Sequence, residues 1–330
     1  MNTLKTVALG SQGLQVSVQG LGCMGMSDFP GGTIYGTPDE RESIATIHLA
    51  IELGVTMLDT ADVYGPFTNE QLVGKALAGK RDQITIATKF GFEVDAAGAI
   101  TYAFNGQPAY VRKSIERSLR NLKTDYIDLY YLHRLDPNTP IEETVGAMAD
   151  LVQEGKVRYL GLSEVPSDII RRAHAVHPIT AIESEYSLFD REVEVTGVLA
   201  TTRELGIGFV GYSPLGRGFL SGAIKSPDDF EPTDSRRMFP RYQGDNFYKN
   251  LELVTKLESM AVTKGVSASQ LALAWVLAQH VVAIPGTKRR TYLEANVAAA
   301  AITLSPSELD ELDAILPVGS VAGSAYPVFS

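Results

Sequence analysis

Short apolar segments and segments of helical spacing alternate along almost the whole chain. Eight strand-then-helix units follow one another from Gln19 onward, and the apolar segments are rich in valine, isoleucine and leucine. Such segments are typical of parallel strands that are buried on both faces of a sheet. Strict alternation over this length predicts an α/β fold, a closed (β/α)8 TIM barrel of about 250 residues before insertions. A doubly wound open sheet is the alternative.

The boundaries of these units follow from the apolar runs and from helix start and stop signals. The expected strands cover residues 19–22, 55–58, 84–88, 129–132, 157–162, 179–182, 207–211 and 281–284. The expected helices cover residues 39–53, 69–77, 108–122, 141–153, 167–175, 192–205, 251–264, 268–279 and 293–300. A final short helix is expected to begin at the capping box formed by Ser305 and Glu308.

Three segments fall outside the alternation. Residues 6–9 and 14–18 are strand-like and flank a Gly-Ser-Gln-Gly turn, which predicts an N-terminal β-hairpin. Residues 90–107 are expected to form a loop. Residues 219–247, after the seventh strand, show little periodicity, and a connection of this length inside a compact domain is usually a functional loop or lid.

Composition and charge narrow the class of protein. The 330 residues show no linker or composition break, so we expect one domain over residues 1–330. A formal net charge of −10 disfavours nucleic acid and anionic membranes as partners. The single cysteine, Cys23, excludes an intrachain disulfide and is typical of a reducing compartment. No apolar run approaches about 18 residues and residues 1–10 lack the core of a secretory signal, so a cytoplasmic location is expected.

Polar side chains stand at the ends of three successive expected strands. Asp59 follows the second strand, Lys89 the third and His133 the fourth, and Tyr64 lies five residues beyond Asp59. Each has a structural alternative when taken singly: Asp59 as a helix cap, Lys89 reaching solvent and His133 as a core histidine. Because catalytic residues of such barrels lie at the C-terminal ends of the strands, we expect the four side chains to meet at one mouth.

These four residue types suit the protonation of an oxygen that gains negative charge, as in carbonyl reduction. A buried Lys89 ammonium beside Asp59 stays charged and is held in place. A cation next to a phenol favours the phenolate, so the pKa of Tyr64 is expected to fall toward the working pH. Neutral His133 can donate a hydrogen bond to a substrate carbonyl oxygen. The spacing of these residues matches no metal-binding motif, and no metal is expected.

Carbonyl reduction needs a hydride, which no side chain supplies and a cofactor must bring. No GxGxxG motif follows the first strand, so a Rossmann nucleotide site is not indicated. Residues 213–218 contain glycines that let backbone N–H groups approach a pyrophosphate. Residues 286–290, after the last strand, include three basic side chains at a position where barrels commonly bind phosphate. A solvated helix start is the alternative for this basic run.

Several motifs resemble those of the aldo-keto reductase superfamily, from about Val7 to Leu312. The matching segments are LGCMGMS (21–27), LDTADVYG (58–65), ATKFG (87–91), DYIDLYYLHR (125–134), GLS (161–163) and GYSPLG (211–216). Residues 183–188 and 284–288 further resemble the branch with bacterial, fungal and plant auxin-induced-type members. The resemblance implies an NADPH-dependent reductase of aldehydes and ketones. In such an enzyme Tyr64 would be the acid, and the remaining members of a catalytic tetrad would be Asp59, Lys89 and His133.

The resemblance also implies the cofactor contacts. Ser163 and Glu183 would bind the nicotinamide carboxamide, and Tyr212 would stack on the nicotinamide ring. The residues implied around the pyrophosphate are Ser213, Leu215, Gly216, Arg217 and Gly218. The residues implied at the adenosine end are Gly286, Thr287, Lys288, Arg289 and Asn296, with Lys288 and Arg289 on the 2′-phosphate and Asn296 on the adenine.

Two departures from the family pattern matter. Glu164 and Glu183 stand where the family commonly has asparagine and glutamine, and Tyr292 stands where many relatives carry an arginine for the 2′-phosphate. An ionised glutamate accepts hydrogen bonds but donates none. We therefore expect Glu183 to place negative charge beside the nicotinamide and to favour its oxidised, positively charged form. A turn of Glu183 toward a lysine or arginine on the rim is the alternative.

Two other functions stay open from the sequence. Lys89 could form a Schiff base in an aldolase-like lyase, or the chain could be an NADP(H)-binding regulatory subunit with slow turnover. A small carbonyl compound is the expected partner, and neither its identity nor the oligomeric state follows from the residues. The candidate pocket residues form an apolar and aromatic set, some of which could instead belong to the core: Met24, Phe67, Phe90 and Phe104.

Overall fold

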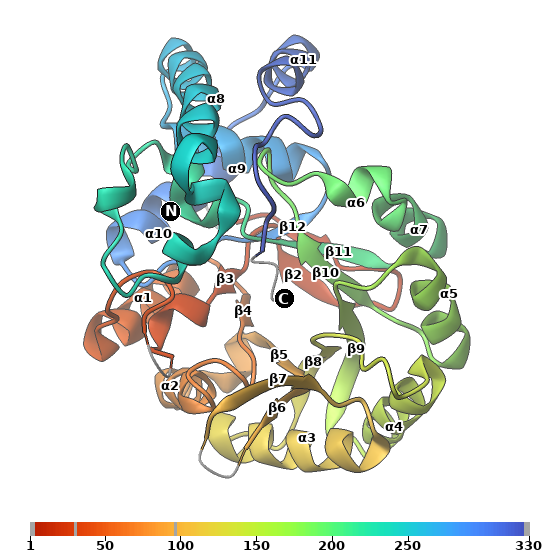
Figure 1. Cartoon of the computed structure of the whole chain (residues 1–330). Coiled ribbons are helices and arrows are strands. Elements are labelled where there is room, and N and C mark those ends of the chain that lie inside the picture. The colour runs from red at the N-terminus through yellow and green to blue at the C-terminus, as the bar shows by residue number, and fades with distance from the viewer. Residues whose placement is uncertain (1–3, 30–31, 96–97, 327–330) are drawn as a thin grey trace.

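Eight parallel strands form a barrel at the centre of the molecule, and the helices surround it (Figure 1). The computed structural model describes residues 4–29, 32–95 and 98–326, so part of the expected domain over residues 1–330 lies outside these ranges. The barrel strands are β3 (Leu21–Gly22), β4 (Met57–Asp59), β5 (Thr85–Phe90), β8 (Ile127–Leu132), β9 (Val157–Ser163), β10 (Ala181–Glu185), β11 (Gly208–Tyr212) and β12 (Val282–Ile284). Parallel bridges from Gln19 to Ala283 and from Gly22 to Gly286 join the first strand to the last. The predicted TIM barrel is therefore confirmed.

The outer helices follow the strands in the predicted alternation. They are α1 (Glu40–Glu52), α2 (Thr68–Ala76), α3 (Pro108–Leu122), α4 (Ile141–Gln153), α5 (Ser167–Val176), α6 (Glu192–Val195), α7 (Val198–Leu205), α8 (Gly244–Lys264), α9 (Ala268–Ala278), α10 (Arg290–Ala298) and α11 (Pro306–Ile315). The predicted capping box at Ser305 and Glu308 is confirmed. The single helix expected over 192–205 was wrong, because Gly197 has a φ of 79° and separates α6 from α7.

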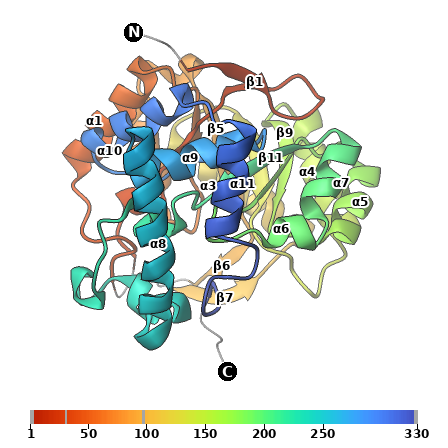
Figure 2. The same ribbon diagram turned by 90° about the horizontal axis from the view of Figure 1, so that it is seen from above.

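Two hairpins lie at opposite ends of the barrel (Figure 2). The predicted N-terminal hairpin is confirmed as β1 (Thr6–Ala8) and β2 (Gln15–Ser17). Its side chains Leu9, Leu14 and Val16 are buried against the side chains that fill the barrel interior. The loop expected over residues 90–107 was wrong in part, because it contains a second hairpin, β6 (Phe92–Val94) and β7 (Ile100–Phe104).

The long connection after β11 contains short 3-10 turns but no α-helix until α8. The turns are η3 (Gly216–Ser221), η4 (Pro227–Asp229), η5 (Ser235–Met238) and η6 (Pro240–Tyr242). Buried aromatic rings hold the segment together: Phe219 contacts Tyr242 and Phe247, with ring centroids 5.4 and 5.1 Å apart. A parallel bridge joins Thr33 to Asp234, so this segment also packs on the loop that follows β3. The remaining 3-10 turns are η1 (Met24–Met26), η2 (Arg81–Gln83) and η7 (Ala299–Ala301).

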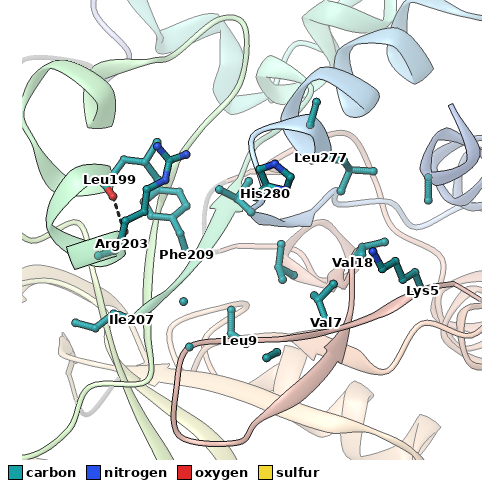
Figure 3. A pocket seen from close by; sticks show the side chains of 18 of the residues that line it. Lys5, Val7, Leu9, Val18, Leu199, Arg203, Ile207, Phe209, Leu277 and His280 are labelled. Carbon is teal, nitrogen blue, oxygen red and sulfur yellow. Dashed lines mark hydrogen bonds between the residues drawn. The ribbon is translucent and has the colours of Figure 1, made fainter. Parts of the chain in front are cut away.

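A cavity of about 1010 Å³ lies at the end of the barrel where the strands begin (Figure 3). Its wall includes Leu9 from the N-terminal hairpin, Gly208 at the start of β11 and Val282 at the start of β12. Neither Tyr64 nor the three strand-end residues Asp59, Lys89 and His133 line it. Within the described ranges, no single helix is long and apolar enough to cross a membrane; only α8 and α9 together pass such a test, across an 89° bend.

Candidate active site

The structure brings together Asp59, Tyr64, Lys89 and His133 at the mouth where the strands end. Asp59 ends β4, Lys89 is the penultimate residue of β5, and His133 follows the last residue of β8. The parallel register aligns Lys89 with Tyr131 on the neighbouring strand, one step from the strand end. All four side chains are buried, with Lys89 at 0% exposure and Tyr64 and His133 at 8%. Their meeting follows from the barrel because parallel neighbours end on the same rim.

Lys89 is the centre of the cluster. Its ammonium donates hydrogen bonds to the Asp59 carboxylate and to the Thr60 carbonyl oxygen, the latter at 3.0 Å. The Glu183 carboxylate on β10 lies 3.2 Å from the same nitrogen. Burial alone would lower the pKa of Lys89, but the two carboxylates outweigh burial and raise it above its ordinary range. The ammonium therefore stays charged at neutral pH.

Tyr64 keeps its proton at neutral pH. Burial raises the pKa of Tyr64 well above its ordinary value, and the nearby Lys89 ammonium offsets only part of that rise. The expected fall of this pKa was therefore wrong, because desolvation of the phenolate exceeds its attraction to the lysine. The Lys89 nitrogen lies 5.3 Å from the centre of the Tyr64 ring. A neutral phenol beside a fixed cation is a proton donor whose conjugate base is stabilised once it forms.

His133 is a neutral imidazole packed edge-on against two aromatic rings. Its ring centre lies 5.8 Å from that of Tyr64 and 5.0 Å from that of Phe92. Burial, together with the charges of Arg134 and Lys89, lowers the pKa of His133 well below its ordinary value. Its Nδ1 atom is buried and has no hydrogen-bond partner within the described part of the chain. The imidazole can therefore contribute an N–H donor at the mouth without adding charge.

A buried ion pair fixes the loop that carries Tyr64. The Asp62 carboxylate accepts a hydrogen bond of 2.6 Å from Arg117 on α3, and the Arg117 guanidinium lies 4.2 Å from the centre of the Phe67 ring. The Asp62 backbone N–H donates to the Lys89 carbonyl oxygen at 3.0 Å, which ties this loop to β5. The sequence analysis did not assign a role to Asp62 or Arg117, since their pairing joins residues 55 positions apart.

Apolar side chains surround the phenol. Met24, Phe29 and Phe92 are partly buried and pack against the cluster that contains Tyr64. Phe104 faces Phe92 across the second hairpin, with ring centroids 5.1 Å apart. The assignment of Phe90 to the pocket was wrong, because this ring is fully buried and stacks on Tyr130 at 4.9 Å within the main core. Phe92 was missed as a wall residue because a strand was not expected at residues 92–94. Phe29 lies in the loop after β3, where no local pattern indicated its contact with the Tyr64 ring.

Ser163, the last residue of β9, is paired in register with Glu183 in the middle of the neighbouring strand β10. Arg134 donates a hydrogen bond of 3.2 Å to the Ser163 hydroxyl. Glu183 points toward Lys89 inside the barrel and not toward a cation on the rim. Burial and the nearby Asp59 carboxylate raise the pKa of Glu183 to about 8. Glu164 instead accepts a hydrogen bond of 2.8 Å from the Glu185 backbone N–H.

The turn after β11 is compact and contains four residues in the left-handed region. Positive φ values of 49°, 52°, 53° and 91° occur at Ser213, Gly216, Arg217 and Gly218. The backbone N–H groups of Gly216 and Gly218 donate to the carbonyl oxygens of Ser213 and Leu215, at 2.9 and 3.0 Å, which fixes the shape of the turn. The Arg217 side chain is not free, because it pairs with Glu185 at 3.0 Å.

The C-terminal segment reaches the same place. In Figure 1 the described part of this segment, up to Tyr326, runs from α11 toward the barrel mouth. The hydroxyl of Tyr326 is 2.6 Å from that of Tyr212 and accepts a hydrogen bond of 2.9 Å from Arg217. Tyr326 was not predicted from the sequence, because no local pattern near this residue indicates a contact 114 residues away.

Two cations of the basic run after β12, Lys288 and Arg289, have no carboxylate partner among the described residues. Lys288 donates to the Tyr35 carbonyl oxygen at 2.9 Å and to that of Gly36, and burial lowers the pKa of its ammonium. Arg290 pairs with Glu42 at 3.0 Å. Arg289 is exposed and, in the part of the chain that the structure describes, has no carboxylate partner. A Cβ added at Gly286 would meet only one atom within 4 Å, so this loop leaves open space.

These features fit a dinucleotide with phosphate groups. The glycines of the turn at residues 213–218 leave room for a pyrophosphate to approach the backbone closely, and the cations of Arg289 and Lys288 suit a further phosphate. The remaining residues assigned to the cofactor lie nearby in the fold: Thr287 is half-buried in the same loop, and Asn296 is buried on α10. No group of three or more His, Cys, Asp or Glu side chains that could hold a metal ion occurs among the described residues.

Fold and site together define a class of protein, a (β/α)8 enzyme whose phenol, ammonium and imidazole can protonate an oxygen at the barrel mouth. A model of the aldo/keto reductase family matches residues 23–317. The chain belongs to the aldo/keto reductase family and is a nicotinamide-dependent oxidoreductase.

Solved structures of this family are similar over almost the whole chain. The glycerol dehydrogenase AKR11B4 from Gluconobacter oxydans is 30% identical, with a TM-score of 0.85 and coverage of 98% of both chains. The aldo-keto reductase AKR11C1 from Bacillus halodurans, in its holo form, is 31% identical, with a TM-score of 0.79 and the same coverage. The thermostable aldo-keto reductase Tm1743, in complex with the inhibitor epalrestat, is 31% identical with a TM-score of 0.74, covering 94% of this chain and 100% of its own.

Proposed function

We propose that this protein reduces aldehydes or ketones to alcohols with NADPH. The observation that carries the proposal is the neutral Tyr64 phenol, held beside the Lys89 ammonium and next to the neutral His133 imidazole. A carbonyl oxygen gains negative charge as the carbon accepts a hydride, and it must take up a proton. A buried neutral acid with a cation behind it is suited to that step.

Each residue of the tetrad has a role in this proposal. Tyr64 donates its O–H proton to the forming alkoxide, and Lys89 stabilises the phenolate that is left. Asp59 holds the lysine in position through its hydrogen bond. His133 orients the carbonyl oxygen by donating an N–H, and Met24, Phe29, Phe92 and Phe104 provide an apolar wall for the substrate. The cofactor supplies the hydride when it is bound.

A panel of aldehydes and ketones tests the activity. The purified protein should oxidise NADPH, followed by its absorbance, in the presence of at least one class of carbonyl compound. Because one similar structure is a glycerol dehydrogenase, the panel should include polyols with the oxidised cofactor to measure the reverse direction. Tight NADPH binding without turnover of any compound would favour a regulatory subunit instead.

The Schiff-base lyase is disfavoured by the state of Lys89. A Schiff-base lysine must be neutral to attack a carbonyl. Here the carboxylates of Asp59 and Glu183 raise the pKa of Lys89 and keep the amine protonated. Borohydride with a carbonyl substrate should therefore leave the mass of the protein unchanged. A stable adduct on Lys89 would contradict the reductase proposal.

The choice of NADPH over NADH should depend on Lys288 and Arg289. Replacing both with alanine is expected to weaken NADPH at least about tenfold relative to NADH, because only NADPH carries the extra phosphate. Titration of both cofactors by fluorescence or calorimetry measures the ratio. Arg290→Ala is a matched control, because Arg290 is paired with Glu42 on α1 and should leave the ratio unchanged. Equal weakening of both cofactors in the double variant would place the 2′-phosphate elsewhere.

A further inference from the structure

Two buried carboxyl groups share one lysine at the centre of the tetrad. Asp59 and Glu183 are each 3% exposed, and both contact the ammonium of Lys89, which is fully buried. The second carboxyl group stands where the resemblance to the family leads one to expect the neutral amide of glutamine. Two carboxylates and one ammonium would leave a net negative charge in a site that excludes water, which is costly.

One proton on the two carboxyl groups would remove that charge. The second oxygens, Asp59 Oδ2 and Glu183 Oε2, are both buried and have no hydrogen-bond partner among the other described residues. The two carboxyl groups meet at one atom, the Lys89 ammonium nitrogen, which donates to Asp59 and lies 3.2 Å from Glu183. One proton held by this pair leaves one positive and one negative charge in the buried cluster. Burial and Asp59 raise the pKa of Glu183 to about 8, so the proton is retained at neutral pH.

The other groups that face Glu183 do not titrate near neutral pH. Lys89 on β5 has a raised pKa and stays charged. Tyr131 on β8 and Tyr64 on the loop after β4 both lie near Glu183, and burial raises the pKa of each phenol above its ordinary value. Asp59 on β4 is the other group that acts on Glu183 among the described residues. The Asp59–Glu183 pair is therefore the part of this cluster that can gain or lose a proton around neutral pH.

We propose that Glu183 and Asp59 store one proton in the resting site, that this proton resupplies Tyr64 during carbonyl reduction, and that Glu183 is left ionised while the oxidised cofactor is bound. The inference rests on the proposed nicotinamide site, which places the cofactor ring beside Glu183 and Ser163. Glu183 is thus a further catalytic residue whose charge follows the oxidation state of the cofactor.

The proton transfers balance at each step. The Tyr64 O–H bond breaks as the O–H bond of the alcohol forms, which leaves a phenolate. An N–H proton of Lys89 passes to that phenolate, and the shared carboxyl proton passes to Lys89 in turn. The cycle ends with a phenol, an ammonium and two carboxylates. A positively charged nicotinamide offsets the added negative charge while it stays bound. After it leaves, Glu183 regains its proton from water.

Proton release on cofactor binding tests the proposal without turnover. Adding NADP+ to the cofactor-free protein at about pH 7 in weak buffer, with an indicator dye, should release close to one proton per site, and NADPH should release far less. Because one proton is linked to binding, the affinity for NADP+ should rise about tenfold per pH unit below about pH 8. Glu183→Gln should bind NADP+ with no proton release and with an affinity that no longer depends on pH in this range.

A matched control and a spectroscopic measurement identify the group. Glu164→Gln removes a carboxylate from the neighbouring strand end that does not contact Lys89, and it should release as many protons as the wild type. The cofactor-free wild type should show an infrared band of a protonated carboxyl group that is lost in Glu183→Gln. Fold integrity of both variants is checked by circular dichroism.

The outcomes separate this inference from the proposed function. Calorimetry shows whether NADP+ binds at all, and absence of binding of either cofactor form would overturn both proposals. Binding of NADP+ without proton release, or the same release from Glu183→Gln as from the wild type, would overturn the stored proton alone. In that case the reductase proposal would stand with Glu183 as a fixed carboxylate.

Discussion

Replacing Tyr64 with phenylalanine is expected to lower kcat for carbonyl reduction at least about 100-fold while the affinity for the cofactor stays nearly unchanged. The change removes only the hydroxyl oxygen. The ring that packs against Met24, Phe29 and Phe92 is kept, so the apolar wall of the site is preserved. The loss is therefore confined to the hydroxyl that donates the proton beside the Lys89 ammonium.

The matched control is Tyr131→Phe. Tyr131 is also a buried tyrosine near Lys89, with its ring centre 5.9 Å from the lysine nitrogen, but it is fully enclosed in the barrel and its hydroxyl has no partner among the described residues. Loss of this hydroxyl removes an unsatisfied polar group, so kcat and thermal stability should both stay close to those of the wild type. Near-normal turnover by Tyr64→Phe, or equal losses in the two variants, would contradict the role of Tyr64.

The meeting of the tetrad was predictable because it depends on strand order and direction, which the sequence pattern reveals. In a parallel barrel, polar residues at the ends of successive strands must reach the same rim, and Asp59, Lys89 and His133 do so through neighbours β4, β5 and β8. The boundaries of most helices follow from local signals for the same reason, since caps such as Asp39 act within one turn.

Contacts between residues far apart in sequence could not be predicted in this way. The Lys89–Glu183 pair joins β5 to β10, which are not neighbours in the sheet, across the inside of the barrel. Tyr326 meets Tyr212 across 114 residues, at the end of a segment with no regular structure. The pKa of Tyr64 was predicted to fall, but it rises. Burial of the phenol, which depends on the whole fold and not on the local sequence, raises this pKa by more than the Lys89 ammonium lowers it.

The second large effect is expected from Lys89→Met, which removes the cation shared by three groups. Kinetically, kcat should fall strongly, because the Tyr64 phenolate loses the charge that stabilises it. Lys89 lowers the pKa of Tyr64 against the effect of burial, so its removal should move the alkaline limb of the pH profile to higher pH. If the alkaline limb of the pH profile of Lys89→Met stayed at the pH measured for the wild type, the effect of Lys89 on the pKa of Tyr64 would be contradicted.

Stability gives an independent measurement of the same change. Breaking a buried ion pair by removing one partner costs about 3–5 kcal/mol in the free energy of unfolding. Without the lysine, the pKa values of Asp59 and Glu183 should rise further in the folded state. A raised folded-state pKa stabilises the protein at pH values below the unfolded pKa, and that contribution is lost as pH rises through the folded value. The difference in Tm between the wild type and Lys89→Met should therefore widen from about pH 5 to about pH 8.

Lys75→Met, at an exposed ion pair with Glu40, is the control and should change the free energy of unfolding by no more than about 1 kcal/mol at any of these pH values. A Tm difference that does not depend on pH would mean that the two carboxyl groups hold their charge without Lys89.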